Sequence, residues 1–260
     1  MSELDRPNAT INYETWREGE SGSWITLVNG HTRSLKDYRL MAKQFAADGF
    51  RVLALDNRGA GATVTTTDFT YLDLAGDVVA LWDHLQIPQS HLLGISMGGE
   101  ISQVVASENP ERVNRLVLVS TTADDRWVIR ANSTPWGNDL AGIEQTLSPY
   151  FSATFLAANQ PLVKAMAKNI LDQVKSGFIT KADSQRRAFR GFNWVARLSG
   201  IGAETLVVHG DQDRIIAPEA AEELAQLIPN ARLKLIPGAG HLLLAETYKQ
   251  LYSLAKDFFT

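Results

Sequence analysis

The chain has 260 residues, of which 45% are hydrophobic and 21% charged, and this fits one large globular domain or one domain with an inserted subdomain. Its formal net charge of −4 argues against a nucleic-acid partner, which usually requires a basic stripe. The absence of cysteine excludes disulfides, thiolate catalysis and cysteine-based zinc sites.

Membrane association is also unexpected. The first seven residues have neither the basic lead nor the apolar core of a signal peptide. Apolar runs such as 116–119 are far shorter than the roughly 20 residues that a membrane-spanning helix needs. We therefore expect a cytoplasmic protein, present as a monomer or a homodimer.

Short apolar runs alternate with helical patterns along most of the chain. The runs are nearly continuous, which is typical of parallel strands covered on both faces. They lie at 24–28, 52–55, 92–95, 116–119, 206–208 and 233–236. Apolar residues at helical spacing predict helices at 35–47, 74–85, 100–107, 218–228 and 251–258. The alternation predicts an α/β fold with a mostly parallel central sheet flanked by helices.

The rhythm breaks between the fourth and fifth runs. Residues 122–199 contain no convincing strand but do contain helical stretches, the clearest at 162–174 between Pro161 and Gly177. We interpret 122–199 as a helical cap inserted into a core formed by 1–121 and 200–260. The cap is rich in aromatic residues, and Trp127, Trp136 and Trp194 are candidates for lining a substrate pocket. The alternative is that these are extra core helices without a functional role.

The strongest chemical signal is Gly94-Ile95-Ser96-Met97-Gly98, which lies between a predicted strand and a predicted helix. This is the G-x-S-x-G pattern in the context that it requires, a sharp turn that exposes the serine hydroxyl at the sheet edge. A phosphate-binding loop would need a Gly-Lys-Ser/Thr ending or a G-x-G-x-x-G pattern, and neither is present. Ser96 is therefore the candidate nucleophile.

A serine nucleophile needs a neighbouring base, and His241 is the best placed of the five histidines. It follows the last predicted strand, at the sheet edge that also carries Ser96. The acid that orients this base should lie between them in the chain, after the penultimate strand. Asp213 is the candidate, with Asp211 as its near rival; Asp124 and Asp125 are more remote options.

Acyl transfer also requires N–H donors for the negative oxygen of the tetrahedral intermediate. One donor should be the backbone N–H of Met97, directly after the nucleophile. The second should come from the loop after the strand at 24–28, where we favour the backbone N–H of His31. The alternative for this loop is a hairpin turn at Asn29-Gly30.

These residues resemble the α/β-hydrolase superfamily over essentially the whole chain. The matching motifs, in order, are Asn29-Gly30-His31, Asp56-x-Arg58-Gly59-x-Gly61, Gly94–Gly99, Gly210-x-x-Asp213 and Gly240-His241. The stretch around Ser96 together with 115–121 looks most like the serine-nucleophile branch of 3-oxoadipate enol-lactonases and small-ester carboxylesterases. Asn29 stands where the family usually has His, and Ala62 stands where many relatives have Ser.

The resemblance implies hydrolysis of a modest-sized, mostly apolar ester or lactone through an acyl-enzyme, without metal or organic cofactor. Three other functions remain open. The chain could cleave carbon–carbon bonds in ring-cleavage products, with Arg190 and Trp194 binding a carboxylated substrate. It could be a cofactor-free perhydrolase, or a receptor that turns its ligand over slowly. Because Ser96 replaces the nucleophilic Asp of dehalogenases and classical epoxide hydrolases, we expect neither activity.

Overall fold

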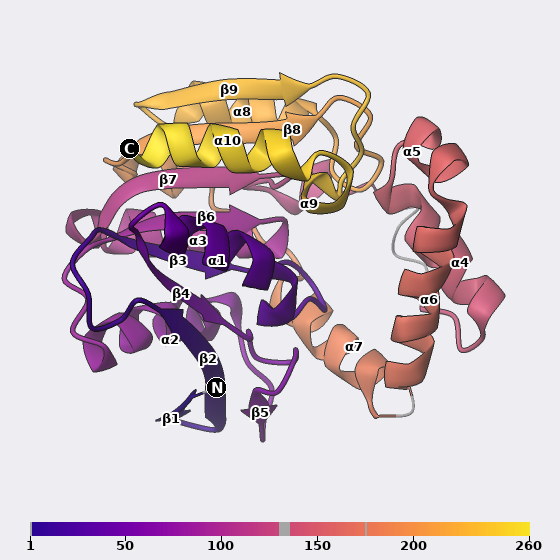
Figure 1. Cartoon of the computed structure of the whole chain (residues 1–260), viewed down its shortest axis with the longest axis horizontal. Coiled ribbons are helices and arrows are strands. Elements are labelled where there is room, and N and C mark those ends of the chain that lie inside the picture. The colour runs from indigo at the N-terminus through magenta and orange to yellow at the C-terminus, as the bar shows by residue number, and fades with distance from the viewer. Residues whose placement is uncertain (1, 130–135, 175) are drawn as a thin grey trace.

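The computed structural model describes residues 2–129, 136–174 and 176–260, and a nine-stranded sheet forms its centre (Figure 1). Eight strands follow one another across the sheet, and β5 (Val64–Thr65) pairs with β2 off this path. In spatial order the eight are β1 (Ser2–Arg6), β2 (Ala9–Trp16), β4 (Arg51–Leu55), β3 (Trp24–Val28), β6 (Ser90–Ile95), β7 (Val113–Val119), β8 (Glu204–Gly210) and β9 (Ala231–Ile236).

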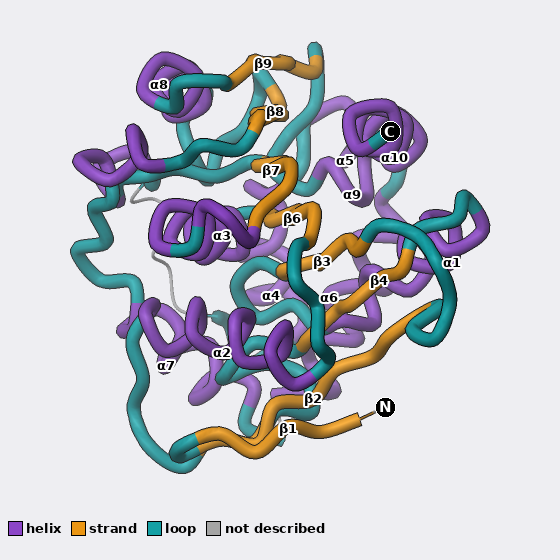
Figure 2. The backbone as a smooth tube through the Cα atoms, turned by 90° about the vertical axis from the view of Figure 1, so that its left-hand side faces the viewer, coloured by secondary structure: helices purple, strands orange, loops and turns teal. Residues whose placement is uncertain are grey.

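The six predicted strands are all present, and they pair in parallel from β4 to β9. Every residue of β3 and of β6 is buried, because helices cover both faces of the sheet. Side chains of α2, α3 and α8 pack on one face of the sheet, and those of α1 and α10 pack on the other (Figure 2). This confirms the predicted fold class.

Three strands at one side of the sheet were not predicted from the sequence. β1, β2 and β5 are antiparallel to their partners, and the register pairs Tyr13 with Leu55 and Leu4 with Ile11. Polar residues alternate with apolar ones in β2, so its apolar run is interrupted. β1 is the edge strand and β2 lies between β1 and β4; antiparallel strands that alternate polar and apolar side chains have this weaker pattern.

The helices of the core match the predicted ones to within a few residues. The predicted helix at 35–47 is divided into a 3-10 turn, Leu35–Tyr38, and α1 (Arg39–Ala47). The other core helices are α2 (Tyr71–His84), α3 (Met97–Glu108), α8 (Glu219–Leu227), α9 (Leu243–Glu246) and α10 (Tyr248–Phe259), with a 3-10 turn at Pro110–Arg112. A capping box between Thr70 and Asp73 fixes the start of α2.

The segment between β7 and β8 is helical where it is described. It contains α4 (Leu140–Leu147), α5 (Ala153–Ala158), α6 (Gln160–Val174) and α7 (Phe178–Ala188), with 3-10 turns at Asp125–Trp127, Ser148–Tyr150 and Val195–Gly200. These helices stand at the carboxyl ends of the parallel strands (Figure 1). They bury a separate apolar cluster that includes Ile143, Phe151 and Ile170. Residues 130–135 and 175 of the predicted cap lie outside the described residues, and its boundaries at 122 and 199 stay a prediction.

Candidate active site

The turn between β6 and α3 holds Ser96 in a strained conformation. Its φ of 55° and ψ of −124° are unusual for a residue with a side chain, and such a conformation costs on the order of 1–3 kcal/mol. The turn is tight because a Cβ on Gly94 would lie 2.3 Å from the Gly98 carbonyl oxygen. A Cβ on Gly98 would lie 2.1 Å from the Val28 carbonyl oxygen. Glycine at both positions therefore allows Ser96 to sit above the sheet edge.

Three predicted residues from three separate loops meet at this edge. The Oγ of Ser96 lies 3.0 Å from Nε2 of His241, and Nδ1 of His241 lies 2.8 Å from Oδ2 of Asp213. The imidazole and the carboxylate are both buried. With a proton on Nδ1, His241 donates to Asp213 and presents the lone pair of Nε2 to the serine hydroxyl. Along the chain the order is nucleophile (Ser96), acid (Asp213) and base (His241), as predicted from the motifs.

Four donors surround the Asp213 carboxylate. Oδ1 accepts the backbone N–H groups of Ile215 at 2.8 Å and Ile216 at 3.0 Å. Oδ2 faces Nδ1 of His241 and also Nε2 of His209, which lies 3.0 Å away and is fully buried. Burial alone would raise the pKa of Asp213, but the two imidazoles and their hydrogen bonds hold that pKa below its ordinary value. The carboxylate is therefore ionised at neutral pH.

The rival carboxylates have other partners. Asp211 accepts the backbone N–H of Gly238 at 2.7 Å, and its side chain is exposed. Asp124 caps the turn that follows it by accepting the N–H of Arg126, and Asp125 accepts the N–H of Gly191. Within the described part of the chain, no hydrogen bond joins any of the three to His241. Asp213 is thus the carboxylate that the fold places beside the imidazole.

The loop after β3 packs directly against the serine. A Cβ on Gly30 would lie 3.3 Å from the Ser96 Cβ, so the loop passes close above the turn. Both His31 and Met97 line the cavity in front of Ser96. Among the described residues, neither backbone N–H donates to a carbonyl of a loop, turn or cap. Met97 is also the first residue of α3, where helix geometry leaves N–H groups without an intrahelical acceptor.

The side chain of His31 ties this loop to α7. Its Nε2 lies 2.8 Å from the Ala182 carbonyl oxygen, and burial lowers the pKa of His31 to about 4. The imidazole is therefore neutral at pH 7, with the Nε2 proton donated to the helix. The next residue, Thr32, donates its backbone N–H to the Gln185 side chain at 2.7 Å, and Gln185 in turn donates to the Arg58 carbonyl oxygen.

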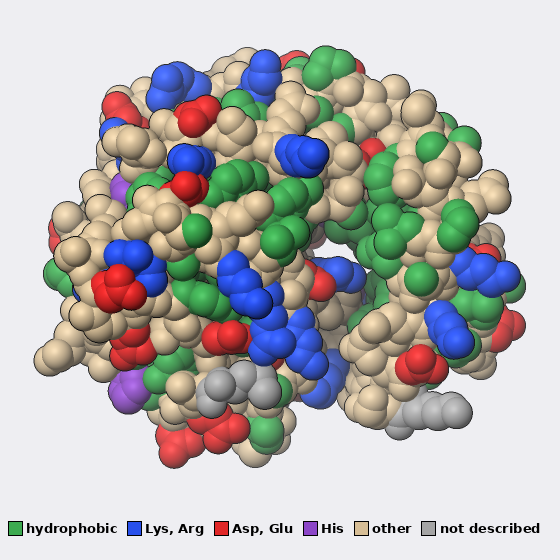
Figure 3. Space-filling model, in the orientation of Figure 1, with side chains coloured by type: hydrophobic (Ala, Val, Ile, Leu, Met, Phe, Trp, Pro, Cys, Tyr) green, Lys and Arg blue, Asp and Glu red, His purple; other side chains and the backbone are tan. Residues whose placement is uncertain are grey.

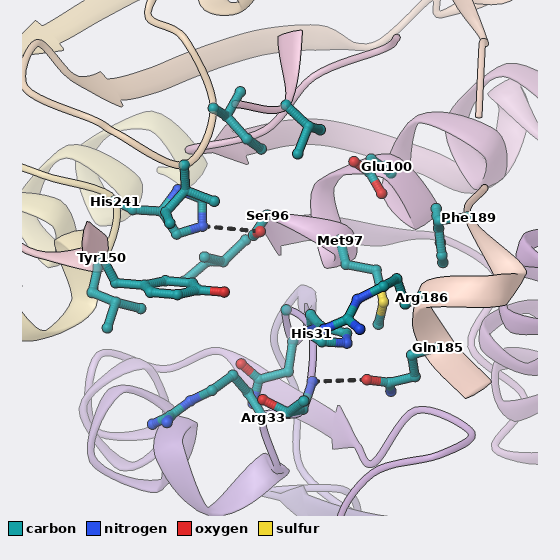
Figure 4. A pocket seen from close by; sticks show the side chains of 18 of the residues that line it. His31, Arg33, Ser96, Met97, Glu100, Tyr150, Gln185, Arg186, Phe189 and His241 are labelled. Carbon is teal, nitrogen blue, oxygen red and sulfur yellow. Dashed lines mark hydrogen bonds between the residues drawn. The ribbon is translucent and has the colours of Figure 1, made fainter. Parts of the chain in front are cut away.

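A cavity of about 960 Å³ lies between the sheet edge and the helices that follow β7. The space-filling view shows the hollow between these two parts of the molecule (Figure 3). Figure 4 shows Ser96 and His241 at its wall, opposite Arg186 and Phe189 of the cap side. Its size suits a small organic substrate, since such sites commonly measure about 300–1,000 Å³.

Of the three tryptophans predicted to line the pocket, only Trp136 lies on the cavity wall. The indole N–H of Trp127 donates to Glu223, and its ring packs beside Ile215 and Ile216, which line the cavity although Trp127 itself does not. Trp194 belongs to the main apolar core and donates to Ser107 at 2.8 Å. Both indole N–H groups thus have partners away from the cavity, since neither Glu223 nor Ser107 lines it.

The cavity wall includes Arg190, which was predicted as a substrate contact, and several polar side chains that were not predicted, among them Glu100, Tyr150, Gln185 and Arg186. The Tyr150 ring meets His241 edge-on at 5.5 Å between centroids. Burial and the nearby Asp125 raise the pKa of Glu100 to about 8. Of these, only Glu100 could have been predicted from the sequence, because it closely follows Ser96 in the chain. The positions of the others depend on how the cap docks on the core.

Neither metal binding nor membrane insertion finds support in the described residues. No cluster of three or more His, Cys, Asp or Glu within residues 2–129, 136–174 and 176–260 could hold a metal ion. Over the same residues, no helix has the length and apolar character to cross a membrane.

Comparison with known proteins identifies the class. The family model described as alpha/beta hydrolase fold matches residues 24–248, and the chain therefore belongs to this family. The predicted resemblance to the superfamily, including its enol-lactonase branch, is confirmed. The chain is a member of a hydrolase family, and its architecture is that of an α/β hydrolase.

Individual relatives are more distant. The chain is 27% identical to a 3-oxoadipate enol-lactonase of Acinetobacter baylyi over 245 residues, covering 92% of this chain and 89% of the relative. It is 30% identical to a 2-hydroxymuconate semialdehyde hydrolase of Pseudomonas sp. strain CF600, covering 85% and 80%. The crystal structure of the enol-lactonase from Burkholderia xenovorans LB400 superposes with a TM-score of 0.86 at 23% identity, over 99% of both chains, and this likeness concerns the fold alone.

Proposed function

We propose that this protein is a serine hydrolase that cleaves carboxylic esters or lactones through an acyl-enzyme on Ser96. The observation that carries the proposal is the continuous hydrogen-bonded series Ser96–His241–Asp213, with distances of 3.0 and 2.8 Å. A serine hydroxyl is a weak nucleophile until a base accepts its proton, and the imidazole of His241 lies within hydrogen-bond distance to do so.

In the proposed reaction, His241 removes the Ser96 proton as Oγ attacks the substrate carbonyl carbon. The buried carboxylate of Asp213 holds the proton of His241 on Nδ1 and stabilises the imidazolium that forms. The same imidazolium then protonates the departing alkoxide. The acyl group stays bound to Ser96 as an ester. A water molecule activated by His241 hydrolyses this ester and frees the serine.

The negative oxygen of the tetrahedral intermediate would be held by the backbone N–H groups of Met97 and His31. Both residues line the cavity beside Ser96, and each such donor contributes on the order of 2.7–4 kcal/mol to the stability of the transition state. This scheme uses only side chains and backbone groups, so it calls for no metal or organic cofactor.

Apolar groups of the cavity wall favour a modest-sized, mostly hydrophobic substrate. Ile95, Trp136, Leu147, Ile170 and Phe189 contribute to this wall. The chain's similarity to an enol-lactonase agrees with an ester or lactone as the reacting group.

Carbon–carbon bond hydrolysis is a second candidate, favoured by two observations. A 30% identical relative bears the name 2-hydroxymuconate semialdehyde hydrolase. The cavity wall also includes Arg190, an exposed residue whose guanidinium has no hydrogen bond or ion pair with any described residue. A carboxylated substrate would give it a partner.

Replacement of Ser96 tests the main proposal. We expect Ser96→Ala to abolish hydrolysis of p-nitrophenyl butyrate and labelling by a fluorophosphonate probe, while Ser253→Ala, at an exposed position of α10, leaves both unchanged. Near wild-type turnover by Ser96→Ala would refute the assignment. A ring-cleavage product assayed in parallel distinguishes the second candidate, which predicts that this compound is the better substrate.

A further inference from the structure

The mechanism above leaves one carboxyl group of the cavity without a role. Glu100 belongs to α3, and its side chain is only 8% exposed although it lies on the cavity wall. Figure 4 shows its carboxyl at the end of the cavity that Met97 and Phe189 also border. Ser96, at the turn that precedes α3, lines the same cavity.

Within residues 2–129, 136–174 and 176–260 this carboxyl accepts no hydrogen bond and forms no ion pair, and the charged group that acts on its pKa is the like-charged Asp125. Other charged groups of the wall are engaged elsewhere or do not reach it: Arg126 pairs with Glu223, and Arg186 with Asp183. Arg190 lines the same cavity without pairing with Glu100.

The surroundings therefore favour the uncharged acid. Burial, with a smaller contribution from Asp125, raises the pKa of Glu100 to about 8. Near pH 7 most molecules carry a proton on this carboxyl, which gives the cavity an O–H donor as well as a carbonyl acceptor. A carboxylic acid kept neutral by its site can act as a hydrogen-bond donor to a bound ligand.

A structural role does not account for this group. Its carboxyl faces the cavity rather than packed protein and holds no described backbone or side-chain group in place. The helix is held to the sheet by other positions, such as Gly98 against β3 and Gly99 against Thr121. The donor of Glu100 can be satisfied only from inside the cavity.

We propose that Glu100 is a specificity-determining residue that donates a hydrogen bond to a second, uncharged oxygen acceptor of the substrate, such as a keto or amide carbonyl. Ser96 and Glu100 both line this cavity, so the acceptor belongs to the same molecule whose carbonyl carbon Ser96 attacks. This inference rests on the proposed function, because it concerns the substrate of the Ser96 site.

Two pairs of isosteric esters test the proposal. Two are needed because the second oxygen acceptor can belong either to the acyl side or to the alcohol side of the ester that Ser96 attacks. In the first pair the keto group is on the acyl side: p-nitrophenyl 4-oxopentanoate against p-nitrophenyl 4-methylpentanoate. In the second it is on the alcohol side: 2-oxopropyl acetate against isobutyl acetate. The measured quantity is the ratio of kcat/KM within each pair, compared between variants so that intrinsic ester reactivity cancels.

In at least one pair we expect the ratio of the wild type to exceed that of Glu100→Leu by about tenfold, the effect of one hydrogen bond. Glu100→Gln, whose amide N–H still donates, should retain most of the preference. In the wild type the preference should fall as the pH rises from 7 to 9.5, because ionisation removes the donor, whereas Glu100→Gln should show no such fall. The pH profile also tests the proposal if Glu100→Leu fails to fold.

Equal ratios in wild type and Glu100→Leu for both pairs, or a wild-type ratio independent of pH in both pairs, would overturn the assignment of Glu100. The failure of the proposed function would look different. In that case the isosteric esters themselves would be hydrolysed at a rate that Ser96→Ala does not change, or not hydrolysed at all.

Discussion

Replacing Asp213 by Asn isolates the role of one oxygen atom. The Asn side chain can keep its carbonyl on the backbone N–H groups of Ile215 and Ile216, which now bond to Oδ1. Its NH₂ group then takes the place of Oδ2 and points at His241 and His209, both of which donate there in the wild type. Because two donors cannot bond to each other, His241 must present a lone pair on Nδ1 and carry its proton on Nε2.

That tautomer cannot accept the proton of Ser96. In a serine protease the equivalent change lowers kcat by about 10⁴, which corresponds to roughly 5 kcal/mol in the activation barrier. We expect a similar loss in kcat for p-nitrophenyl butyrate with Asp213→Asn, and a comparable slowing of fluorophosphonate labelling. The loss of two charge-assisted bonds also predicts a lower free energy of unfolding, by about 1.5–3 kcal/mol for each bond.

Asp211→Asn is the matched control, because Asp211 lies in the same loop and binds only the Gly238 N–H, which an Asn carbonyl also accepts. Its kcat should stay within about twofold of the wild type, since its hydrogen bond is retained. If Asp213→Asn kept kcat within tenfold of the wild type, or if Asp211→Asn lost as much, the assignment of the orienting carboxylate would be wrong.

Two further predictions concern the framework of the site. The pKa of His31 falls from 6.5 to about 4 on folding, so the unfolded chain binds more protons than the folded one between these pH values. The free energy of unfolding should therefore fall as the pH drops from 6.5 through 4. In urea titrations over this range, the free energy of unfolding of His31→Gln should fall by up to about 3 kcal/mol less than that of the wild type. Gly98→Ala should lower the melting temperature by more than 10 °C, because the new Cβ would lie 2.1 Å from the Val28 carbonyl oxygen. Gly202→Ala is the control and should change the melting temperature little, because the space around Gly202 is open. Equal melting temperatures for the two variants would contradict this explanation of the turn.

The features predicted correctly from the sequence are those encoded by local patterns. The glycines around Ser96 report a backbone turn too tight for a Cβ, and the position of His241 after the last strand places it at the same sheet edge. The parallel strands are recognisable because burial on both faces leaves continuous apolar runs. For these elements, a few consecutive residues contain the necessary information.

The features that were missed depend on how distant segments dock. The orientation of Trp194 is set by Ser107 on another helix, 87 positions earlier in the chain, so its place in the core is not visible from the aromatic content of the cap. In the same way, Gln185 reaches the cavity only because α7 packs against the loop at Thr32. Composition predicts that a cap is apolar, but not which of its side chains turn inward.

The attachment of α7 has a consequence for redesign of this enzyme. The helix supplies cavity residues such as Arg186, and through Ala182 and Gln185 it also holds the loop that carries the His31 N–H. Under the proposed function, a change in α7 therefore alters both substrate preference and reaction rate. A graft that exchanges α7 for the helix of a relative will disturb the loop as well, unless its partners His31 and Arg58 are transplanted with it.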